Sequence, residues 1–340
     1  MPAQLSKDFH LKVFFEASPG LIQSSAIALG FFDGVHPGHQ VVIGKAVEEA
    51  RRLGVTAGVV TFRDHPRALT RGVHPLLLTD IDQRLHLFES LGVEATLVLT
   101  FSEALCRLSP REYVENVLVG AMGARSISVG HNHHFGRDRE GNPDLLRQFG
   151  ETMGFSVHVA PMVFVNETEV SSSAIRESIV DGDMTKAASL LSRCYCVGGQ
   201  VVKGDGRGRQ IGFPTANVQL REFQLIPRTG VYAGRVRLSN AETFGAVINV
   251  GYRPTFKAAS GINEDPLVEA HLFDFDRDIY GDKCTVEFLE YLRTEKKFDG
   301  VEGLKEQINL DAKKARLVLE HDTSAAGGEP NSGDKSKQPA

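Results

Sequence analysis

Two histidines with a spacing suited to catalysis stand near the start of the chain. In GFFDGVHPGHQ (30–40), His36 and His39 flank Pro37, a residue that favours the first turn of a helix. Side chains at positions i and i+3 share one face of such a helix. Two imidazoles directed at phosphates could neutralise the charge that builds as a P–O bond breaks. The alternative is a pair of surface histidines beside a helix cap, and the clustered GxFDGxHxGH pattern favours a functional site.

The same loop has the glycines and the position of a phosphate site. A strand predicted over residues 24–30 runs into it, and a helix is expected to begin near Pro37. Amides at a helix N-terminus and the helix dipole favour phosphate above the carboxyl edge of a parallel sheet. Gly34 and Gly38 let the backbone approach a ligand without a side chain in the way.

A second polar motif, VSSSAIRES (170–178), follows later in the first half. Serine hydroxyls at a helix start, together with free amides, can hold triphosphate oxygens. The guanidinium of Arg176 can pair with phosphate bidentately. Alone, SSSxIR is an ordinary capping sequence. Together with the histidine motif in one α/β domain, it indicates a nucleotide site.

Two further loops, 61–69 and 129–142, follow predicted strands and carry more histidines. A metal site is the alternative here, but His131, His133 and His134 are too close in sequence to converge easily on one ion. Asn132 has both an amide donor and an acceptor, so it is the better candidate for reading a nucleotide.

The second half carries a separate constellation in GRGRQIGFPTANV (206–218). Its glycines suit a loop that wraps phosphates, although it is not a Walker A sequence. Thr215 and Asn217 offer two oxygen ligands on one side of an extended segment, and hard oxygens suit Mg²⁺. The alternative is an edge turn, because Pro214 cannot occupy a central strand.

A carboxylate and an arginine complete this second set. Glu269 lies in the alternating run EAHLFDF, on the face of His271 and Phe273, and could act as a general base for a hydroxyl. Arg293 stands beside the last predicted strand and could close over a ligand. A solvated strand carboxylate and a surface arginine are the alternatives when each is taken alone.

The elements that must position these residues change character midway. In the first half, β-rich runs alternate with amphipathic stretches, which predicts a mainly parallel sheet with helices on both faces. The expected strands are 24–30, 55–62, 95–101 and 125–130, and the expected helices are 39–54, 80–93 and 109–124. From about Cys194, short alternating runs predict a small β-barrel closed by a helix over 301–320.

The fold class is therefore α/β plus all-β, with a Rossmann-like first domain and a barrel second. We expect domains over 1–186 and 187–320, joined through the helical stretch 184–193. The tail 321–340 lacks aromatic and large aliphatic residues and is expected to be disordered.

Composition narrows the class of protein. The 340 residues are 41% hydrophobic and 24% charged, with a formal net charge of −5, so no basic field favours nucleic acid. No apolar run approaches the roughly 18–20 residues of a membrane helix, and no secretion signal is evident. The four cysteines lack paired zinc spacings and suit reduced thiols in the cytoplasm. Self-association is left open.

The histidine motif resembles the HxGH nucleotidyltransferase superfamily. Over residues 10–320, the order of motifs resembles the bifunctional prokaryotic riboflavin kinase/FAD synthetase family. The motifs that carry this resemblance are GFFDGVHPGHQ, TFRDHP, SSSAIR, GRQIGFPTANV, INVGYRPTF, EAHLFDFDRDIYG and FLEYLRTEKKF. Those of the second half are specific to riboflavin kinase, whereas those of the first half alone also suit other nucleotidyltransferases.

The resemblance implies two reactions. The barrel would transfer the γ-phosphate of ATP to the ribityl 5′-hydroxyl of riboflavin, giving FMN and ADP. The first domain would transfer AMP from ATP to FMN, giving FAD and pyrophosphate. Magnesium is the implied cofactor, and the implied partners are riboflavin, FMN, FAD and ATP, with no nucleic acid and no membrane.

The resemblance also implies roles for individual residues. Glu269 would be the kinase base, His36 and His39 would meet the triphosphate, and Thr215 and Asn217 would ligate Mg²⁺. Residues implied in flavin binding are His65, Pro66 and Arg293. Residues implied in ATP binding are Gly30, Phe32, Asp33, Gly34, Asn132, Ser171, Ser172, Ser173, Arg176, Gly204, Gly206, Gly212 and Phe213.

The chain departs from the family pattern at Phe31, at Asp64 and at the pair His133 and His134, none of which removes a proposed catalytic group.

Two alternatives to the bifunctional enzyme remain. One is a riboflavin kinase without adenylyltransferase activity, which the retained first-half motifs disfavour. The other is a flavin- or nucleotide-binding regulator, which the retained Glu269 disfavours because binding alone needs no base.

Overall fold

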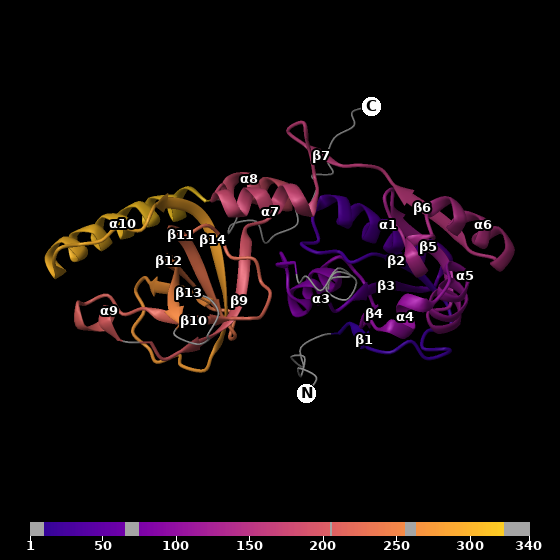
Figure 1. Ribbon diagram of the computed structural model, residues 1–340, viewed down its shortest axis with the longest axis horizontal. Helices are drawn as coiled ribbons and strands as arrows, with labels where there is room; N and C mark the ends of the chain where they lie inside the picture. Colours follow the sequence, from indigo (N-terminus) through magenta and orange to yellow (C-terminus); the bar gives the residue numbers. More distant parts are fainter. Residues whose placement is uncertain (1–9, 65–74, 205, 256–262, 323–340) are drawn as a thin grey trace, which may run out of the picture.

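The computed structural model describes residues 10–64, 75–204, 206–255 and 263–322. Two units lie side by side, a sheet domain built from the first half and a barrel built from the second (Figure 1). Two helices of the connecting region, α7 (Ser172–Asp181) and α8 (Met184–Leu191), lie between them. The predicted succession of an α/β domain and an all-β domain is confirmed.

The sheet domain is a parallel sheet of six strands in the order β1-β4-β3-β2-β5-β6. The sheet reverses its order of winding between β2 and β5, and ligands of doubly wound sheets bind at the carboxyl edge beside such a point. The strands are β1 (Lys12–Phe14), β2 (Ser25–Leu29), β3 (Thr56–Phe62), β4 (Ala95–Leu99), β5 (Ala124–Gly130) and β6 (Ser156–Ala160).

Helices cover both faces of this sheet, so its central strands read as continuous apolar runs. The first helix, α1, has Pro37 in its first turn and ends at Gly54, whose φ of 65° is the left-handed cap that glycine favours. The helices are α1 (Pro37–Leu53), α3 (Ile81–Ser90), α4 (Glu103–Arg107), α5 (Pro110–Tyr113), η1 (Val114–Ala121) and α6 (Pro143–Met153).

The helix predicted over 109–124 differs from expectation. It opens as predicted, with Ser109 capping the amide of Glu112 and Pro110 in the first turn. It then widens into the π-helix η1. Gly120 accommodates the wider turn, because a Cβ there would lie 2.8 Å from the carbonyl oxygen of Glu115. Nothing in the apolar periodicity distinguishes this geometry from an ordinary helix.

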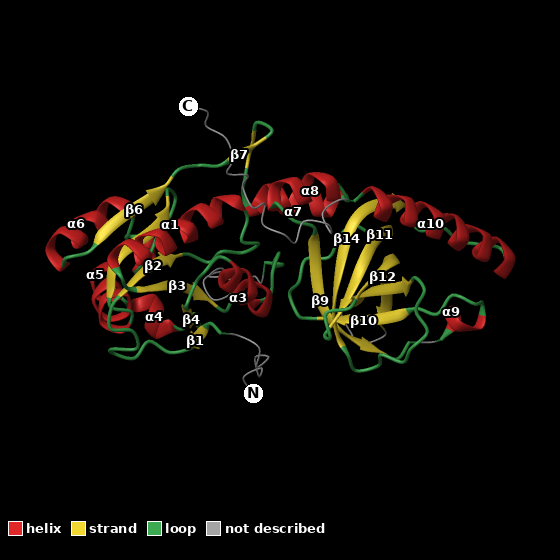
Figure 2. Ribbon diagram, turned by 180° about the vertical axis from the view of Figure 1, so that it is seen from behind, coloured by secondary structure: helices red, strands yellow, loops and turns green. Residues whose placement is uncertain are grey.

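The second domain is a closed antiparallel barrel in the order β10-β13-β12-β11-β14-β9 (Figure 2). Its strands are β9 (Tyr195–Val202), β10 (Ala216–Leu220), β11 (Gly230–Leu238), β12 (Thr243–Thr255), β13 (Asn263–Leu272) and β14 (Lys283–Arg293). The final helix, α10 (Val301–His321), packs on the outside of the barrel through Ala315 and Leu319. The predicted barrel and its covering helix are confirmed.

Smaller elements complete the chain: the hairpin β7 (Phe164–Val165) and β8 (Thr168–Glu169), and the short helices η2 (Arg137–Arg139) and α9 (Arg207–Gln210). The four cysteines are free. Across the described ranges, no helix combines the length and apolarity that crossing a membrane requires. The tail expected to be disordered lies, from residue 323 on, outside the described residues.

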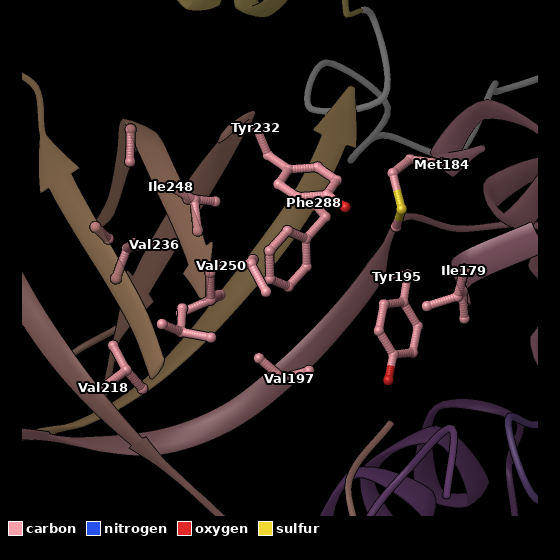
Figure 3. Packing of buried hydrophobic residues seen from close by; sticks show 14 of the residues in the cluster. Ile179, Met184, Tyr195, Val197, Val218, Tyr232, Val236, Ile248, Val250 and Phe288 are labelled. Carbon is pink, nitrogen blue, oxygen red and sulfur yellow. The ribbon is translucent and has the colours of Figure 1, made fainter. Parts of the chain in front are cut away.

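One apolar cluster runs from the barrel interior into the connecting helices (Figure 3). Ile179 of α7 and Leu190 of α8 belong to the same buried cluster as Tyr195, Val197 and Phe288 of the barrel. Residue 186, where we expected the domains to meet, lies inside α8. The packed unit around the barrel therefore begins before residue 187.

Candidate active sites

The two histidines of the first motif lie at the carboxyl edge of the sheet, where β2 passes into α1. His36 is the residue before the first turn of α1 and is only 6% exposed. The rings of His36 and His39 stack with centroids 3.6 Å apart. Their Nδ1 atoms are buried and have no hydrogen-bond partner among the described residues. His36 is therefore buried and His39 half-buried, each with an unused polar atom, which disfavours the alternative of surface histidines.

Both rings are held neutral by their surroundings. Burial, with the nearby Arg193, lowers the pKa of His36 to about 4. Burial and the neighbouring His36 hold the pKa of His39 well below its usual range. Neutral imidazoles can still donate hydrogen bonds to phosphate oxygens. The expected charge neutralisation therefore has to come from other groups, or from proton uptake when a phosphate arrives.

The serine and arginine motif contacts the histidine loop. Arg176 of α7 forms an ion pair with the carboxylate of Asp33, and its Nε donates to the carbonyl oxygen of Leu76 at 3.0 Å. The hydroxyl of Ser172 donates to the carbonyl oxygen of Asp33 at 3.1 Å. Segments about 140 positions apart in the chain are thereby joined into one site.

Asp33 holds this loop together. It is 2% exposed, and its carboxylate accepts the backbone amides of Leu78 and Thr79, each at 3.0 Å. Gly34, with a φ of 84°, lies so close to Leu78 that a Cβ would be 2.8 Å from the leucine side chain. These contacts explain why the motif requires an aspartate and a glycine at these positions.

The remaining predicted residues of the first site lie around this loop. Phe32 is buried and meets the ring of His39 edge-on at 5.3 Å, whereas Asn132 is exposed just beyond β5. Ser171 caps α7 by accepting the amide of Ala174 at 3.3 Å, and Ser173 is exposed. Gly30 follows β2 directly. His65 and Pro66 lie outside the described residues.

Sequence reasoning missed Arg84, a fully buried arginine of α3. Its guanidinium donates to the carbonyl oxygens of Phe31 at 2.9 Å, Phe62 at 2.8 Å and Arg63 at 3.0 Å. It therefore ties the histidine loop to the end of β3 and places a positive charge beneath the site. A signal was available, because Arg84 interrupts the apolar face of the helix predicted over 80–93.

The barrel brings Asn217 and Glu269 side by side. The antiparallel register pairs Asn217 of β10 with Glu269 of β13, and pairs Glu269 in turn with Asn249 of β12. Val268 and Ala270, which flank Glu269 on β13, belong to the buried core of the barrel. Because side chains alternate along a strand, Glu269 and its paired asparagines lie on the outer face. Glu269 is half-buried and Asn217 is 7% exposed. Asn249 was not singled out from the sequence, although it alternates with core residues in the run INVG.

A cavity of about 300 Å³ opens beside this row. Four predicted residues line it, namely Gly204, Gly206, Thr215 and Asn217. Its other wall is the loop 275–280, whose lining role the sequence did not reveal. Gly204 packs directly on the side-chain amide of Asn217, where any Cβ would collide. The glycine loop therefore shapes the approach to the predicted metal ligands.

Four predicted residues of the second half do not line that cavity, namely Glu269, Gly212, Phe213 and Arg293. Gly212 is exposed with a φ of 89°, and Phe213 meets the ring of His271 edge-on at 5.5 Å. Arg293 of β14 makes a bidentate ion pair with Asp311 of α10, its Nη2 lying 2.7 Å from Oδ2. Its Nη1 donates to the carbonyl oxygen of Thr294 at 2.8 Å. In this geometry Arg293 anchors α10.

The sheet domain is of a nucleotide-binding type, and the barrel that follows carries a carboxylate beside a glycine loop. These features together are those of a transferase with two sites. Residues 19–174 match the family model of FAD synthetase, and residues 191–319 match that of riboflavin kinase.

Curated relatives named bifunctional riboflavin kinase/FMN adenylyltransferase match along almost the whole chain. The relative from Bacillus subtilis is 37% identical, covering 86% of this chain and 91% of its own. The relative from Pseudomonas fluorescens is 38% identical, covering 85% and 91%. That from Haemophilus influenzae is 35% identical, covering 88% and 96%. The chain belongs to the bifunctional riboflavin kinase/FMN adenylyltransferase family.

A solved structure shares the complete two-domain fold. It comes from Streptococcus pneumoniae, is described as a macrolide-efflux protein, and is 30% identical with a TM-score of 0.81. The match covers 90% of this chain and 99% of that one. The likeness therefore includes both domains and the helices between them.

Proposed function

We propose that this chain makes FAD from riboflavin in two ATP-dependent steps, each at its own site. The barrel phosphorylates riboflavin to FMN, and the sheet domain adenylylates FMN to FAD with release of pyrophosphate. Membership of the family and the two family-model matches support this division. The observation that carries it is the presence of two separate constellations, the stacked pair His36 and His39 and the paired Asn217 and Glu269.

In the barrel, Glu269 serves as the general base. It accepts the proton of the ribityl 5′-hydroxyl while that oxygen attacks the γ-phosphorus of ATP. The bond from the γ-phosphorus to its bridging oxygen breaks, and ADP leaves. Glu269 is half-buried beside Asn217, so a substrate hydroxyl can come within hydrogen-bond reach of its carboxylate. A general base requires this reach.

Thr215 and Asn217 are proposed to hold Mg²⁺. Their side-chain oxygens are hard ligands at the wall of one cavity, and the described residues contain no cluster of three or more His, Cys, Asp or Glu that could form a full cage. This donor set fits Mg²⁺, which commonly takes few protein ligands and completes its shell with waters and phosphates. Bound there, the ion would offset charge on the transferred phosphoryl group. Gly204 and Gly206 would lie along the phosphates, and Gly212 and Phe213 would border them.

In the sheet domain, a phosphate oxygen of FMN attacks the α-phosphorus of ATP, and pyrophosphate leaves. His36 and His39 would donate hydrogen bonds to the phosphates as neutral imidazoles. Arg176 would supply positive charge. The loop 30–40 leads into α1, and the first turn of α7 is hydrogen-bonded to it through Ser172, so two helix N-termini, which favour anions, lie at this loop. The remaining proposed ATP contacts are Gly30, Phe32, Asp33, Gly34, Asn132, Ser171, Ser172 and Ser173.

The proposed flavin contacts are His65, Pro66 and Arg293. Arg293 also anchors α10 through Asp311. Arg293 would therefore shape the flavin site as well as border it. We assign the two activities to domains over 1–186 and 187–320, with α8 shared by packing. A cytoplasmic location is proposed as well, and the four free thiols support it.

Reciprocal variants test the assignment of each step. Glu269→Gln removes the base, so FMN formation should fall by roughly 10²-fold or more, the usual contribution of general base catalysis. Conversion of supplied FMN to FAD should stay within about twofold of wild type. The double variant His36→Ala with His39→Ala should show the reverse pattern.

Matched controls are the exposed Glu290→Gln on β14 and the exposed His86→Ala on α3. Each control variant should leave the rates of FMN formation and FAD formation within about twofold of wild type. Kinase turnover that survives in Glu269→Gln to the level of Glu290→Gln would show that the base is wrongly assigned. Normal FAD formation by the histidine double variant would remove the first constellation from the mechanism.

A further inference from the structure

Arg193 joins the riboflavin-kinase segment to the histidine motif. It stands two residues inside the stretch that matches riboflavin kinase, residues 191–319, and well beyond the FAD synthetase match that ends at residue 174. Yet its Nη2 donates to the carbonyl oxygen of Gly34 at 2.6 Å. Gly34 lies in the loop that carries His36, so a residue of one module contacts the catalytic loop of the other.

The surroundings of Arg193 are built for this contact. The end of α8 is held by the same guanidinium, whose Nη1 donates to the carbonyl oxygen of Leu191 at 3.3 Å. A second link lies beside it, because Nε2 of Gln40 donates to the hydroxyl of Ser192 at 3.2 Å and to the carbonyl oxygen of Val35 at 3.0 Å. Ser192 adopts the left-handed conformation, with a φ of 58°, that turns the chain toward the loop.

The charge of Arg193 is also directed at this site. Within the described residues, no carboxylate forms an ion pair with its guanidinium, and burial lowers its pKa. Its positive charge acts on both His36 and His39. By contrast, Arg221, which also crosses between the domains, is neutralised by Asp80 at 3.1 Å and Asp82 at 2.7 Å and, within the described residues, makes no hydrogen bond or ion pair with the loop 30–40.

We propose that Arg193 is a positioning residue of the FMN adenylyltransferase site, supplied by the riboflavin-kinase segment. It fixes the backbone of the loop at Gly34 and so sets the placement of His36, and it adds positive charge beside the two histidines. The adenylyltransferase site is then incomplete without the first residues of the neighbouring module. This inference rests on the proposed function, since it assigns a role within the second of the two steps.

The test compares Arg193→Met with the matched interface variant Arg221→Met in the full-length protein. Methionine keeps the apolar stem of arginine and removes the donors and the charge. Because a hydrogen bond to a charged group contributes about 10- to 150-fold, we expect kcat for FAD formation to fall about 20-fold in Arg193→Met. The KM for FMN should stay within about twofold, and so should the kinase kcat. Arg221→Met should leave both rates within about threefold.

Arg193→Lys keeps the charge and one donor group, so it should recover part of the kcat that Arg193→Met loses. If the methionine variant folds poorly, the lysine variant tests the proposed positioning role in its place. Equal losses in Arg193→Met and Arg221→Met would overturn the proposal, as would a parallel loss of both activities in the lysine variant, because either marks a role in stability alone. A wild-type chain that forms FMN but no FAD would instead overturn the proposed function.

Discussion

At the scale of residues, the two sites use different electrostatics. His36 is buried and His39 is half-buried, both rings are held neutral, and the positive charge around them comes from the arginines at positions 84, 176 and 193. Glu269 instead lies on the outer face of the barrel, between two asparagines. The position of Glu269 leaves its carboxylate within reach of a substrate hydroxyl, as its proposed role as a base requires.

The histidines with a lowered pKa, at positions 36, 39 and 133, should make the protein sensitive to acid. Burial lowers the pKa of His133, in the loop after β5, to about 4. The unfolded chain, with a histidine pKa near 6.5, takes up this proton first as the pH falls, so stability is full above about 6.5 and declines toward about 4. Between pH 7 and pH 5 the wild type should lose about 2 kcal/mol more than His133→Phe, which has no group to protonate there.

Urea unfolding at the two pH values measures this difference. The phenylalanine ring should keep the stacking on Phe135, whose centroid lies 6.0 Å away, so the variant should remain folded. Identical pH dependence in the two proteins would mean that His133 is accessible to protons in the folded state.

At the scale of elements, starts and ends of helices could be predicted, whereas contacts between strands could not. Pro37 and Gly54 bound α1 through local chemistry that reads directly from the sequence. The pairing of Asn249 with Glu269 depends on the register of two strands, and the cavity wall at 275–280 depends on barrel closure. Such long-range geometry leaves no local pattern, which is why Asn249 and that wall were missed.

The anchoring of α10 gives a prediction at this scale. Asp311 is 1% exposed and holds Arg293 through two oxygens. Asp311→Asn removes one partner of a largely buried pair and should cost about 2–3 kcal/mol of unfolding free energy, somewhat less than a fully buried pair. The exposed pair that Asp274 forms with Arg316 of the same helix provides the control, and Asp274→Asn should leave the free energy of unfolding nearly unchanged.

Urea unfolding of the two variants gives both values, and equal small losses would show that α10 is not anchored through Asp311. Riboflavin KM measured alongside separates the two roles of Arg293. A much larger rise in KM for Arg293→Met than for Asp311→Asn is expected if Arg293 also contacts the flavin. Equal rises would limit Arg293 to anchoring.

At the scale of the whole molecule, the two domains share packing as well as a chain. The apolar cluster of the barrel includes α7, the helix whose first turn carries the serine and arginine motif (Figure 3). Arg193 and Arg221 add polar contacts across the same region. The order of the domains could be predicted from the sequence. Their shared core could not be predicted. The apolar periodicity of its residues indicates that each is buried, but it does not indicate which residues each one contacts.

The shared core predicts that both activities depend on α7. Ile179 is fully buried there, and Ile179→Ala should cost about 3 kcal/mol through the cavity it leaves. Because its cluster spans α7 and the barrel, both activities should then be lost at the same lower urea concentration. Val180→Ala, its neighbour at 54% exposure, should leave both midpoints unchanged. A kinase midpoint unaffected by Ile179→Ala would show that the barrel is stable without α7.

We propose that one chain carries two ATP-dependent sites acting in sequence. The most direct test is chromatographic analysis of products over time, with purified protein, riboflavin, ATP and Mg²⁺. We predict that FMN appears first and FAD follows, and that omitting Mg²⁺ suppresses FMN formation. Accumulation of FMN without FAD would contradict the adenylyltransferase assignment. Tight flavin binding without either product would contradict the whole account and favour a binding protein.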